Sequence, residues 1–357
     1  MSTARLRTLL LLAKKPALSA IADADEGRIP RLEYVELARR IGAEIVDFYD
    51  VERSTHPAVK IAAKKGPHWG LAALGVARRH EFDHFYATGE DVGMPLGMML
   101  HAVRWYGRTT MVVHHGGTPK RRKVLRALGP RPFRNVIVLA ERQREILVDE
   151  LGFPAVAVHR MNQWLDARFY APRDGGNHRG EYVFAVGRES RDYPTLERAA
   201  ALLPEVRFRV IGSGWAPHAG FDRATNLSGR APNVAVETGL SYEELREGYA
   251  RARVFVAPID RVDYAAGVTG ICEAMSMGRA VVASDSPGIR DYVKHGVSGL
   301  LVPVGDAKAM AEAIRELWND PDRCARMGAH NRRWVEEAMS VDQYAERVAG
   351  LLGVWPS

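Results

Sequence analysis

Short apolar runs alternate with longer amphipathic stretches along most of the chain, and few folds are compatible with this alternation. In the first half the runs of strand length are residues 8–13, 44–48, 84–88, 110–114, 135–139 and 156–159. Helical patterns such as residues 33–41 and 141–151 lie between them. Strands separated by helix-length segments are typical of βαβ units, whose strands run parallel. We therefore expect an α/β protein with doubly wound parallel sheets.

A polar stretch at residues 171–180, APRDGGNHRG, interrupts the alternation and indicates a linker. Beyond it the expected strands are residues 182–186, 207–211, 233–236, 254–257, 280–283 and 299–302. The expected helices are residues 193–203, 241–252, 270–277 and 307–319. A chain of 357 residues is long for one core. We predict two Rossmann-like domains, residues 1–170 and 181–340, with a helix in residues 341–357 packing back on the first. Ligands should bind where the carboxyl ends of the strands face an interdomain cleft.

The net charge of +7 is unevenly distributed. Residues 1–170 contain 27 Lys and Arg against 18 Asp and Glu (+9), whereas residues 171–357 contain 23 against 25 (−2). The basic half includes residues 120–123 (KRRK), Arg126, Arg131 and Arg134. Two interpretations stay open: a solvated helix face, or a surface that attracts an anionic lipid surface or acidic acceptor. We do not expect nucleic acid as a partner, because no basic platform interleaved with aromatic residues is present.

The cysteine content is consistent with a reducing compartment, and the hydropathy with the absence of a membrane-spanning segment. Only Cys272 and Cys324 are present, so no disulfide framework is expected. No apolar run approaches the ~20 residues that span a bilayer. We expect a cytoplasmic protein, with peripheral association at the inner membrane face as the alternative. Histidine and cysteine spacing suggests no metal site, and we interpret Asp23-Ala24-Asp25 as a turn.

Residues 266–278, AGVTGICEAMSMG, carry the strongest functional signal. Two glycines, Gly267 and Gly270, lead from a strand-end loop into a helix, and the free amides at a helix start favour phosphate. Glu273 lies one turn further, among apolar neighbours. From there its carboxylate could accept hydrogen bonds from ribose hydroxyls; the alternative is a solvated helix glutamate.

The run from Gly267 to Asp306, GVTGICEAMSMGRAVVASDSPGIRDYVKHGVSGLLVPVGD, resembles the donor-binding segment of the retaining, family-4 (group 1) glycosyltransferases of the GT-B fold. The resemblance extends through residues 186–199, 210–214 and 233–259 and covers about half of the chain with good specificity. It implies a GT-B architecture whose first domain binds the acceptor and whose second domain binds a nucleotide sugar.

The resemblance also implies roles for single residues. Glu273 would hold the nucleotide ribose, and the backbone at Gly267, Val268 and Thr269 would contact the diphosphate and sugar. Gly212, in the VIGSG strand end, would belong to the same donor site. Arg188 corresponds to the family's diphosphate-binding arginine and Arg191 to its nearby lysine. The alternative for these two cations is surface pairing with Glu189 and Asp192.

One position departs from the family pattern. The family often has a second glutamate eight residues before the first, and this chain has Ala265 there. Because that carboxylate usually contacts the donor sugar, its absence leaves the identity of the sugar open.

In the first domain, VVHHGGTP (residues 112–119) resembles the family's strand-end histidine near the donor sugar and acceptor. His115 fits the pattern, with His114 as the substitute; a satisfied loop histidine is the alternative. In ATGEDVG (residues 87–93), Glu90 or Asp91 could bind acceptor hydroxyls or act as a base. Helix capping by Asp91 is equally consistent with its position.

The function implied is transfer of a sugar from a UDP- or GDP-linked donor to a hydroxyl of a glycan, glycolipid or small molecule. The resemblance implies retention of configuration and neither a metal nor another cofactor. Catalysis would then rest on Arg188, Arg191 and His115, with two cations and the helix start stabilising the leaving diphosphate. Two alternatives stay open: a nucleotide-sugar epimerase or hydrolase of the same fold, and a catalytically silent nucleotide-sugar-binding subunit.

Overall fold

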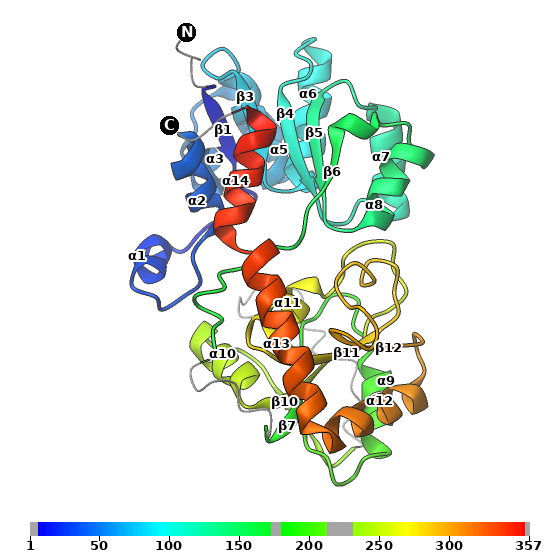
Figure 1. Ribbon diagram of the computed structural model, residues 1–357. Helices are drawn as coiled ribbons and strands as arrows, with labels where there is room; N and C mark the ends of the chain where they lie inside the picture. The colour runs from blue at the N-terminus through cyan, green and yellow to red at the C-terminus, as the bar shows by residue number, and fades with distance from the viewer. Residues whose placement is uncertain (1–5, 173–179, 213–230, 354–357) are drawn as a thin grey trace. The chain divides into compact units, whose positions relative to one another are not determined.

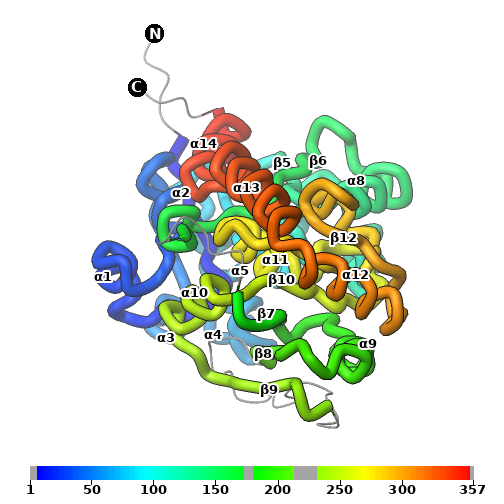
Figure 2. The backbone as a smooth tube through the Cα atoms, turned by 60° about the horizontal axis from the view of Figure 1, so that its bottom comes forward, coloured from blue at the N-terminus to red at the C-terminus, as the bar shows by residue number. Residues whose placement is uncertain are grey.

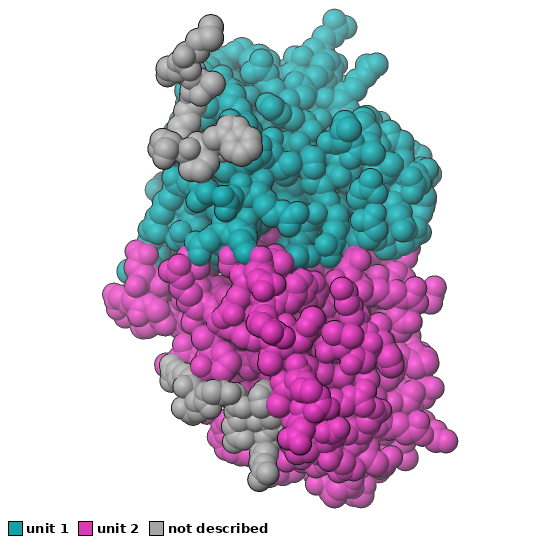
Figure 3. All heavy atoms as spheres, in the orientation of Figure 1, with its two compact units in different colours: residues 1–22, 32–162, 341–357 teal, residues 23–31, 163–340 magenta. Residues whose placement is uncertain are grey.

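The computed structural model describes residues 6–172, 180–212 and 231–353 and divides the chain into two compact units (Figure 3). Unit 1 consists of Met1–Ala22, Leu32–Asn162 and Val341–Ser357, and unit 2 of Asp23–Arg31 and Gln163–Ser340. Residues 163–170, which we expected in the first domain, therefore belong to unit 2. Most of the expected linker, residues 173–179, lies outside the described residues.

Unit 1 is built on a parallel six-stranded sheet with strand order β2-β1-β3-β4-β5-β6 (Figure 1). The strands are β1 (Thr8–Leu11), β2 (Glu44–Val46), β3 (His84–Ala87), β4 (Thr109–Val113), β5 (Phe133–Val138) and β6 (Val158–Arg160). The helices are α2 (Glu33–Ile41), α3 (Phe48–Arg53), α4 (Pro57–Ala63), α5 (Pro67–Ala77), α6 (Glu90–Ala102), α7 (Pro119–Leu128), α8 (Glu141–Glu145) and α14 (Val341–Leu352). A π-helix, η1 (Ile146–Glu150), continues α8, and a 3₁₀ turn, η2 (Ala155–Ala157), precedes β6. Helix α1 (Ala20–Asp25) contains residues of both units.

Unit 2 repeats this architecture with strand order β12-β11-β10-β7-β8-β9, again all parallel. The strands are β7 (Tyr182–Val186), β8 (Phe208–Ile211), β9 (Val234–Glu237), β10 (Ala252–Ala257), β11 (Ala280–Ser284) and β12 (Gly299–Val302). The helices are α9 (Tyr193–Ala201), α10 (Tyr242–Ala250), α11 (Val268–Ser276), α12 (Ala307–Asn319) and α13 (Pro321–Ala338). The two sheets with their helices agree with the α/β fold expected from the alternating pattern.

The sequence explains where most helices of unit 2 begin. Asp192, Asp306 and Asp320 each accept a hydrogen bond from a first-turn amide of α9, α12 and α13. Ser241 and Glu244 form a reciprocal capping box at α10. Helix α11 differs, because it begins after Gly267 at φ +79° and no side chain caps it. Its first-turn amides are therefore left for another acceptor.

The last helix, α14, belongs to unit 1 and packs beside α2, so the two ends of the described chain meet there (Figure 1, Figure 2). The buried hydroxyls of Tyr86 and Tyr344 hydrogen-bond to each other, which joins β3 to α14. Asn135 of β5 also donates to the carbonyl of Leu351, at 3.5 Å.

Some local expectations were wrong. Asp23 and Asp25 lie in helix α1 rather than in a turn, and Asp23 pairs with Arg28. Helix α11 begins at Val268, two residues earlier than expected. Among the described residues, no helix has both the length and the apolar character needed to cross a membrane.

In unit 2, Arg332 of α13 fastens the chain segment that precedes β7. Its Nη1 donates to the carbonyl oxygens of Ala167 (2.9 Å), Tyr170 (2.7 Å) and Ser276 (2.9 Å). The Ser276 hydroxyl also donates to the carbonyl of Tyr170, at 2.6 Å. One guanidinium thus joins α13, the end of α11 and the segment that carries Tyr170.

We predict that Arg332→Met lowers the free energy of unfolding by about 1–3 kcal/mol, because it leaves these carbonyl groups without their charged donor. Arg326→Met, an exposed arginine on the same helix, is the control and should change stability by less than ~0.5 kcal/mol. Urea unfolding measures both. Equal stabilities of the two variants would contradict this role of Arg332.

Candidate functional site

The start of helix α11 is an open anion-binding position at the carboxyl end of the unit 2 sheet. The amides of Val268, Thr269 and Gly270 donate to no acceptor in the described part of the chain, and the first helical bond runs from Ile271 to Gly267. Gly267 is held in the left-handed region, and a Cβ there would lie 2.6 Å from Ile259 Cδ1. Free amides and the positive end of the helix dipole together favour a bound phosphate.

The guanidinium of Arg191 lies against this helix start. A Cβ on Gly267 would be 3.0 Å from Arg191 Nη1, and a Cβ on Gly187 would be 2.2 Å from Nη2, so only glycines leave room for it. Arg191 donates to the carbonyl oxygens of Val186 (3.0 and 3.1 Å) and Glu189 (2.7 Å). No carboxylate within the described ranges forms an ion pair with it, and burial lowers its pKa. Arg191 is half-buried, and Glu189 acts on it electrostatically without forming an ion pair. A bound anion would therefore supply a direct charge partner.

Two loops hold Arg191 in place. The amide of Asp260 donates to the carbonyl of Ser190 (3.0 Å), and the amide of Asp192 donates to that of Pro258 (2.9 Å). The Ser190 hydroxyl also hydrogen-bonds to Tyr264, at 2.8 Å. The loop after β7 is thereby joined to the loop after β10, at the carboxyl ends of both strands.

Glu273 lies further along α11, at ~9 Å from Gly267 by the helix rise of 1.5 Å per residue. Its side chain is half-buried, and Oε2 accepts a hydrogen bond from the Tyr249 hydroxyl at 2.7 Å. A Cβ on Gly270 would lie 3.4 Å from that hydroxyl, so the glycine one turn earlier leaves space for Tyr249. Glu273 is therefore a positioned carboxylate rather than a solvated helix residue.

Burial raises the pKa of Glu273 to about 7, although the hydroxyls of Tyr249 and Tyr170 act in the opposite direction. The Tyr170 hydroxyl is buried and interacts electrostatically with the carboxylate, but its geometry is not that of a hydrogen bond. The tyrosine rings form an aromatic cluster around the carboxylate, with Tyr170 and Tyr249 edge to face at 6.2 Å. Near neutral pH the carboxyl group is thus balanced between its two protonation states.

Together these groups can bind a molecule with a diphosphate at one end and a diol about one helix turn away. Cationic and amide donors suit phosphate oxygens, and a carboxylate suits neighbouring hydroxyls. Tyr249, Tyr170 and Tyr264 were not expected from the sequence. No local motif marks them, because Tyr249 is 24 residues from Glu273 and Tyr170 is 103 residues away.

The other residues expected at the donor site lie near it in unit 2. Arg188 and Thr269 are exposed, and the side chain of Val268 is buried, so that only its backbone could contact a ligand. Gly212 directly follows β8, but the next residues, 213–230, are outside the described part of the chain. The alternative pairing of Arg191 with Asp192 is wrong, since Asp192 caps α9.

Ala265 lies in the loop before α11 and is half-buried. Gly288 packs directly on this loop, since a Cβ there would be 2.0 Å from the Tyr264 carbonyl oxygen. The position thus presents a methyl group where the family often has a carboxylate.

In unit 1, Glu90 is 1% exposed and holds the histidine loop. Its oxygens accept hydrogen bonds from the amides of His114 (2.8 Å) and His115 (2.7 Å), and Arg121 Nε lies 3.1 Å away. Burial alone would raise the pKa of this carboxyl, but hydrogen bonds from His115 and from backbone amides, together with the charge of His114, lower it to about 2. Glu90 positions the loop, and its burial does not fit the expected contact with an acceptor.

The histidines themselves are half-buried. His114 Nε2 lies 3.2 Å from the carbonyl oxygen of Thr88, and His115 Nδ1 lies 3.4 Å from Glu90 Oε1. Asp91 is exposed and pairs with Arg121 at 2.8 Å. It does not cap α6, whose N-cap is Gly89. Contact of His114, His115 or Asp91 with an acceptor stays a prediction.

The basic residues 120–123 occupy the first turns of α7. Arg121 pairs with Glu90 and Asp91, and Arg122 pairs with Glu150 at 2.9 Å. Lys120, Lys123 and Arg126 are exposed. Part of the cluster is thus structural, and its attraction to an anionic surface stays a prediction. Among the residues that the structure describes, no three His, Cys, Asp or Glu side chains gather as a metal site.

Residues 183–320 match the family described as glycosyl transferases group 1. A GDP-mannose-dependent alpha-(1-6)-phosphatidylinositol monomannoside mannosyltransferase from Mycobacterium tuberculosis is 31% identical over 160 residues, 42% of this chain and 42% of that protein. The match thus spans less than half of that relative. An alpha-D-kanosaminyltransferase from Streptomyces kanamyceticus is 24% identical over 74% of this chain and 72% of its own.

Solved structures show the fold over nearly the whole chain. HepE from Anabaena, in complex with UDP and glucose, matches with a TM-score of 0.73 and 17% identity, covering 98% of this chain and 100% of that one. Sucrose-phosphate synthase from Thermosynechococcus elongatus matches with a TM-score of 0.71 and 17% identity, covering 98% of each chain. The predicted GT-B fold and the resemblance to group 1 glycosyltransferases are confirmed.

The raised pKa of Glu273 predicts a specific pH dependence of stability. A carboxyl with a pKa of about 7 when folded and ~4.5 when unfolded keeps its proton longer in the folded state. Its stabilising contribution is therefore complete below pH ~4.5 and is lost as the pH rises through 7. Relative to Glu273→Gln, the native chain should lose roughly 1–3 kcal/mol between pH 4.5 and 8, less than full linkage because the group is half-buried.

Urea unfolding of both proteins at several pH values measures this difference. Tyr249→Phe removes a donor to the carboxylate, so the loss should extend to higher pH in that variant. A difference between native protein and Glu273→Gln that does not vary with pH would contradict the raised pKa.

Proposed function

We propose that this chain, whose residues 183–320 match the glycosyl transferases group 1 family, transfers a sugar from a nucleoside-diphosphate sugar to an acceptor hydroxyl. The observation that carries the proposal is that Arg191, which forms no ion pair with any described residue, lies beside the uncapped start of α11. Glu273, held by Tyr249, adds a carboxylate ~9 Å further along α11 than Gly267, where it would meet the ribose. These groups fit the parts of a nucleotide sugar that are common to all such donors.

In this function the residues of unit 2 stabilise the leaving nucleoside diphosphate. Negative charge grows on the diphosphate as the bond to the sugar breaks, and donors that are already in place stabilise it without reorganisation. The amides of Val268 and Thr269, the guanidinium of Arg191 and the exposed Arg188 supply such donors. Since these groups provide positive charge, we propose transfer without a required metal. Retention of the anomeric configuration is supported by the sequence resemblance alone.

For the nucleotide base of the donor and for the acceptor, we propose only the chemical class. The donor would carry UDP or GDP: the Anabaena HepE structure contains UDP, and the mycobacterial relative is named GDP-mannose-dependent. The acceptor would be a glycolipid, glycan or small molecule. Unit 1 would supply the acceptor contacts, with His115 or His114 as the polar group near the reacting hydroxyl.

Ala265 favours a second candidate, a nucleotide-sugar-binding protein without turnover. With a methyl group at this position, the donor sugar lacks the carboxylate contact that the family often provides. An epimerase or hydrolase of the same fold would need further acid and base groups in the donor site.

We predict that Glu273→Ala and Arg191→Ala affect different parts of the ligand. Glu273→Ala should weaken UDP or GDP binding about 10–100-fold, the equivalent of ~1.5–3 kcal/mol, and leave inorganic pyrophosphate binding unchanged. Arg191→Ala should weaken the binding of both ligands, because in this proposal the Arg191 guanidinium contacts the phosphates. Lys308→Ala, an exposed residue of α12, is the control. Calorimetric titration measures all of them, and equal loss of pyrophosphate binding in both variants would refute the ribose role of Glu273.

A turnover assay separates the candidate functions. The chain is incubated with UDP- and GDP-sugars, with and without candidate acceptors, and free nucleoside diphosphate is measured. We expect release that depends on acceptor and falls ~10²–10³-fold in Arg191→Ala. Release without acceptor would indicate a hydrolase, interconversion of the sugar an epimerase, and tight binding without release a silent subunit.

A further inference from the structure

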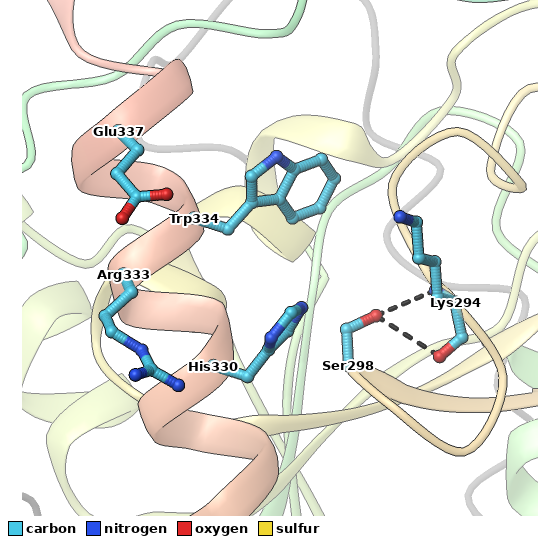
Figure 4. Close-up of a pocket in the computed structure, with 6 residues that line it drawn as sticks. All are labelled: Lys294, Ser298, His330, Arg333, Trp334 and Glu337. Carbon is cyan, nitrogen blue, oxygen red and sulfur yellow. Dashed lines mark hydrogen bonds between the residues drawn. The ribbon is translucent and has the colours of Figure 1, made fainter.

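Apart from the donor site, unit 2 contains a pocket lined by Lys294, Ser298, His330, Arg333, Trp334 and Glu337 (Figure 4). Its volume is about 270 Å³. Four of the lining residues come from helix α13 and the other two from the loop that precedes β12. The function proposed above makes no use of it.

The α13 side of the pocket is one face of the helix. His330, Arg333, Trp334 and Glu337 are spaced i, i+3, i+4 and i+7, which places them on adjacent turns. Trp334 packs partly on the core of unit 2, so its indole forms one wall of the pocket and is held in position by that packing. Figure 4 shows Trp334 and His330 extending from the helix toward the loop.

The opposite side is a tightly bonded loop. The amide of Lys294 donates to the Ser298 hydroxyl at 2.8 Å, and the amide of Gly296 donates to the carbonyl of Gly299 at 2.8 Å. Asn331 of α13 donates to the carbonyls of Ser298 (2.8 Å) and Arg279 (2.9 Å), which fixes the helix to the loop. These bonds fix the backbone on both sides of the pocket, whereas the side chains of Lys294, Arg333 and Glu337 are exposed.

These bonds also place the pocket away from the donor site. Arg279 and Ser298 immediately precede β11 and β12, so α13 meets the sheet at the amino ends of these strands. Arg191 and the start of α11 follow the carboxyl ends of β7 and β10. In a parallel sheet the amino ends and the carboxyl ends of the strands lie at opposite ends of the sheet.

The charge of the pocket favours an anion. Lys294 and Arg333 form no ion pair with any residue in the ranges that the structure describes, and His330 adds a further nitrogen that can donate. Glu337 is the one carboxylate among the lining residues, so the pocket is lined by two permanent positive charges and one negative charge. An arginine fork together with a lysine is a common arrangement for phosphate oxygens.

The size of the pocket limits the rest of the ligand. Sites for drug-sized molecules measure roughly 300–1,000 Å³, so about 270 Å³ holds a phosphate and one ring but not a nucleotide sugar. We propose that the pocket binds a phosphate monoester of a small sugar or polyol, with Arg333 and Lys294 on the phosphate and the ring against Trp334. The ester is either a free metabolite or a lipid headgroup, which share this chemistry.

The test measures binding to the full chain. The probes are inorganic phosphate, glucose 6-phosphate, neutral glucose, and phosphatidylcholine vesicles with and without phosphatidic acid. Calorimetry follows the soluble probes and cosedimentation the vesicles. Tryptophan fluorescence, compared with that of Trp334→Phe, reports whether Trp334 senses the soluble probes. The variants are Arg333→Ala, Lys294→Ala and Glu337→Gln, with Arg326→Ala as an exposed control on the same helix.

We expect glucose 6-phosphate to bind more tightly than inorganic phosphate, and glucose not to bind. Arg333→Ala should weaken binding at least tenfold, Lys294→Ala several-fold and Arg326→Ala not at all, whereas Glu337→Gln should strengthen it. Vesicle binding that requires phosphatidic acid and Arg333, without binding of glucose 6-phosphate, would assign the site to a lipid-borne phosphate. No binding of any phosphate probe, binding unchanged in Arg333→Ala, or displacement of the probe by UDP or GDP would overturn the proposal.

Discussion

The positive charge of Arg191 beside the uncapped start of helix α11 is the constraint on which the donor site depends. Gly267 and Gly187 leave space for the Arg191 guanidinium beside amides that have no acceptor in the described residues. A folded chain holds a half-buried cation whose hydrogen-bond acceptors are all carbonyl groups at a cost in stability. That cost is understandable if the cation is kept for an anionic ligand, because strain and unpaired charge concentrate at functional sites.

The Tyr249–Glu273 hydrogen bond likewise holds a charged group in position, further along the same helix. The carboxylate would be expensive to hold among apolar side chains without a donor, and Tyr249 supplies one at 2.7 Å. Unit 1 shows a parallel arrangement, in which buried Glu90 holds the amides of His114 and His115. In unit 2 a tyrosine hydroxyl positions a half-buried carboxylate, whereas in unit 1 a fully buried carboxylate positions the histidine loop.

The pattern of apolar runs was sufficient to predict the sheets, because strands such as β10 are buried on both faces and are continuously apolar over most of their length, here residues 254–257. The glycine-rich approach to helix α11 and the position of Glu273 followed from local sequence, although the helix begins two residues earlier than expected. Tyr249, Tyr170 and the buried state of Glu90 could not be predicted, since their partners are distant in sequence and meet only after folding. The longest helix, α13, has a polar sequence with Gly328 inside it, so its apolar stripe gave no clear signal.

The measurement that tests this account most directly is a crystal structure of the chain with a bound nucleoside diphosphate. The account predicts phosphate oxygens within hydrogen-bond distance of the amides of Val268 and Thr269 and of the Arg191 guanidinium, with the ribose hydroxyls on the Glu273 carboxylate. A diphosphate bound away from the start of α11, with the Glu273 carboxylate not in contact with the ribose, would contradict it.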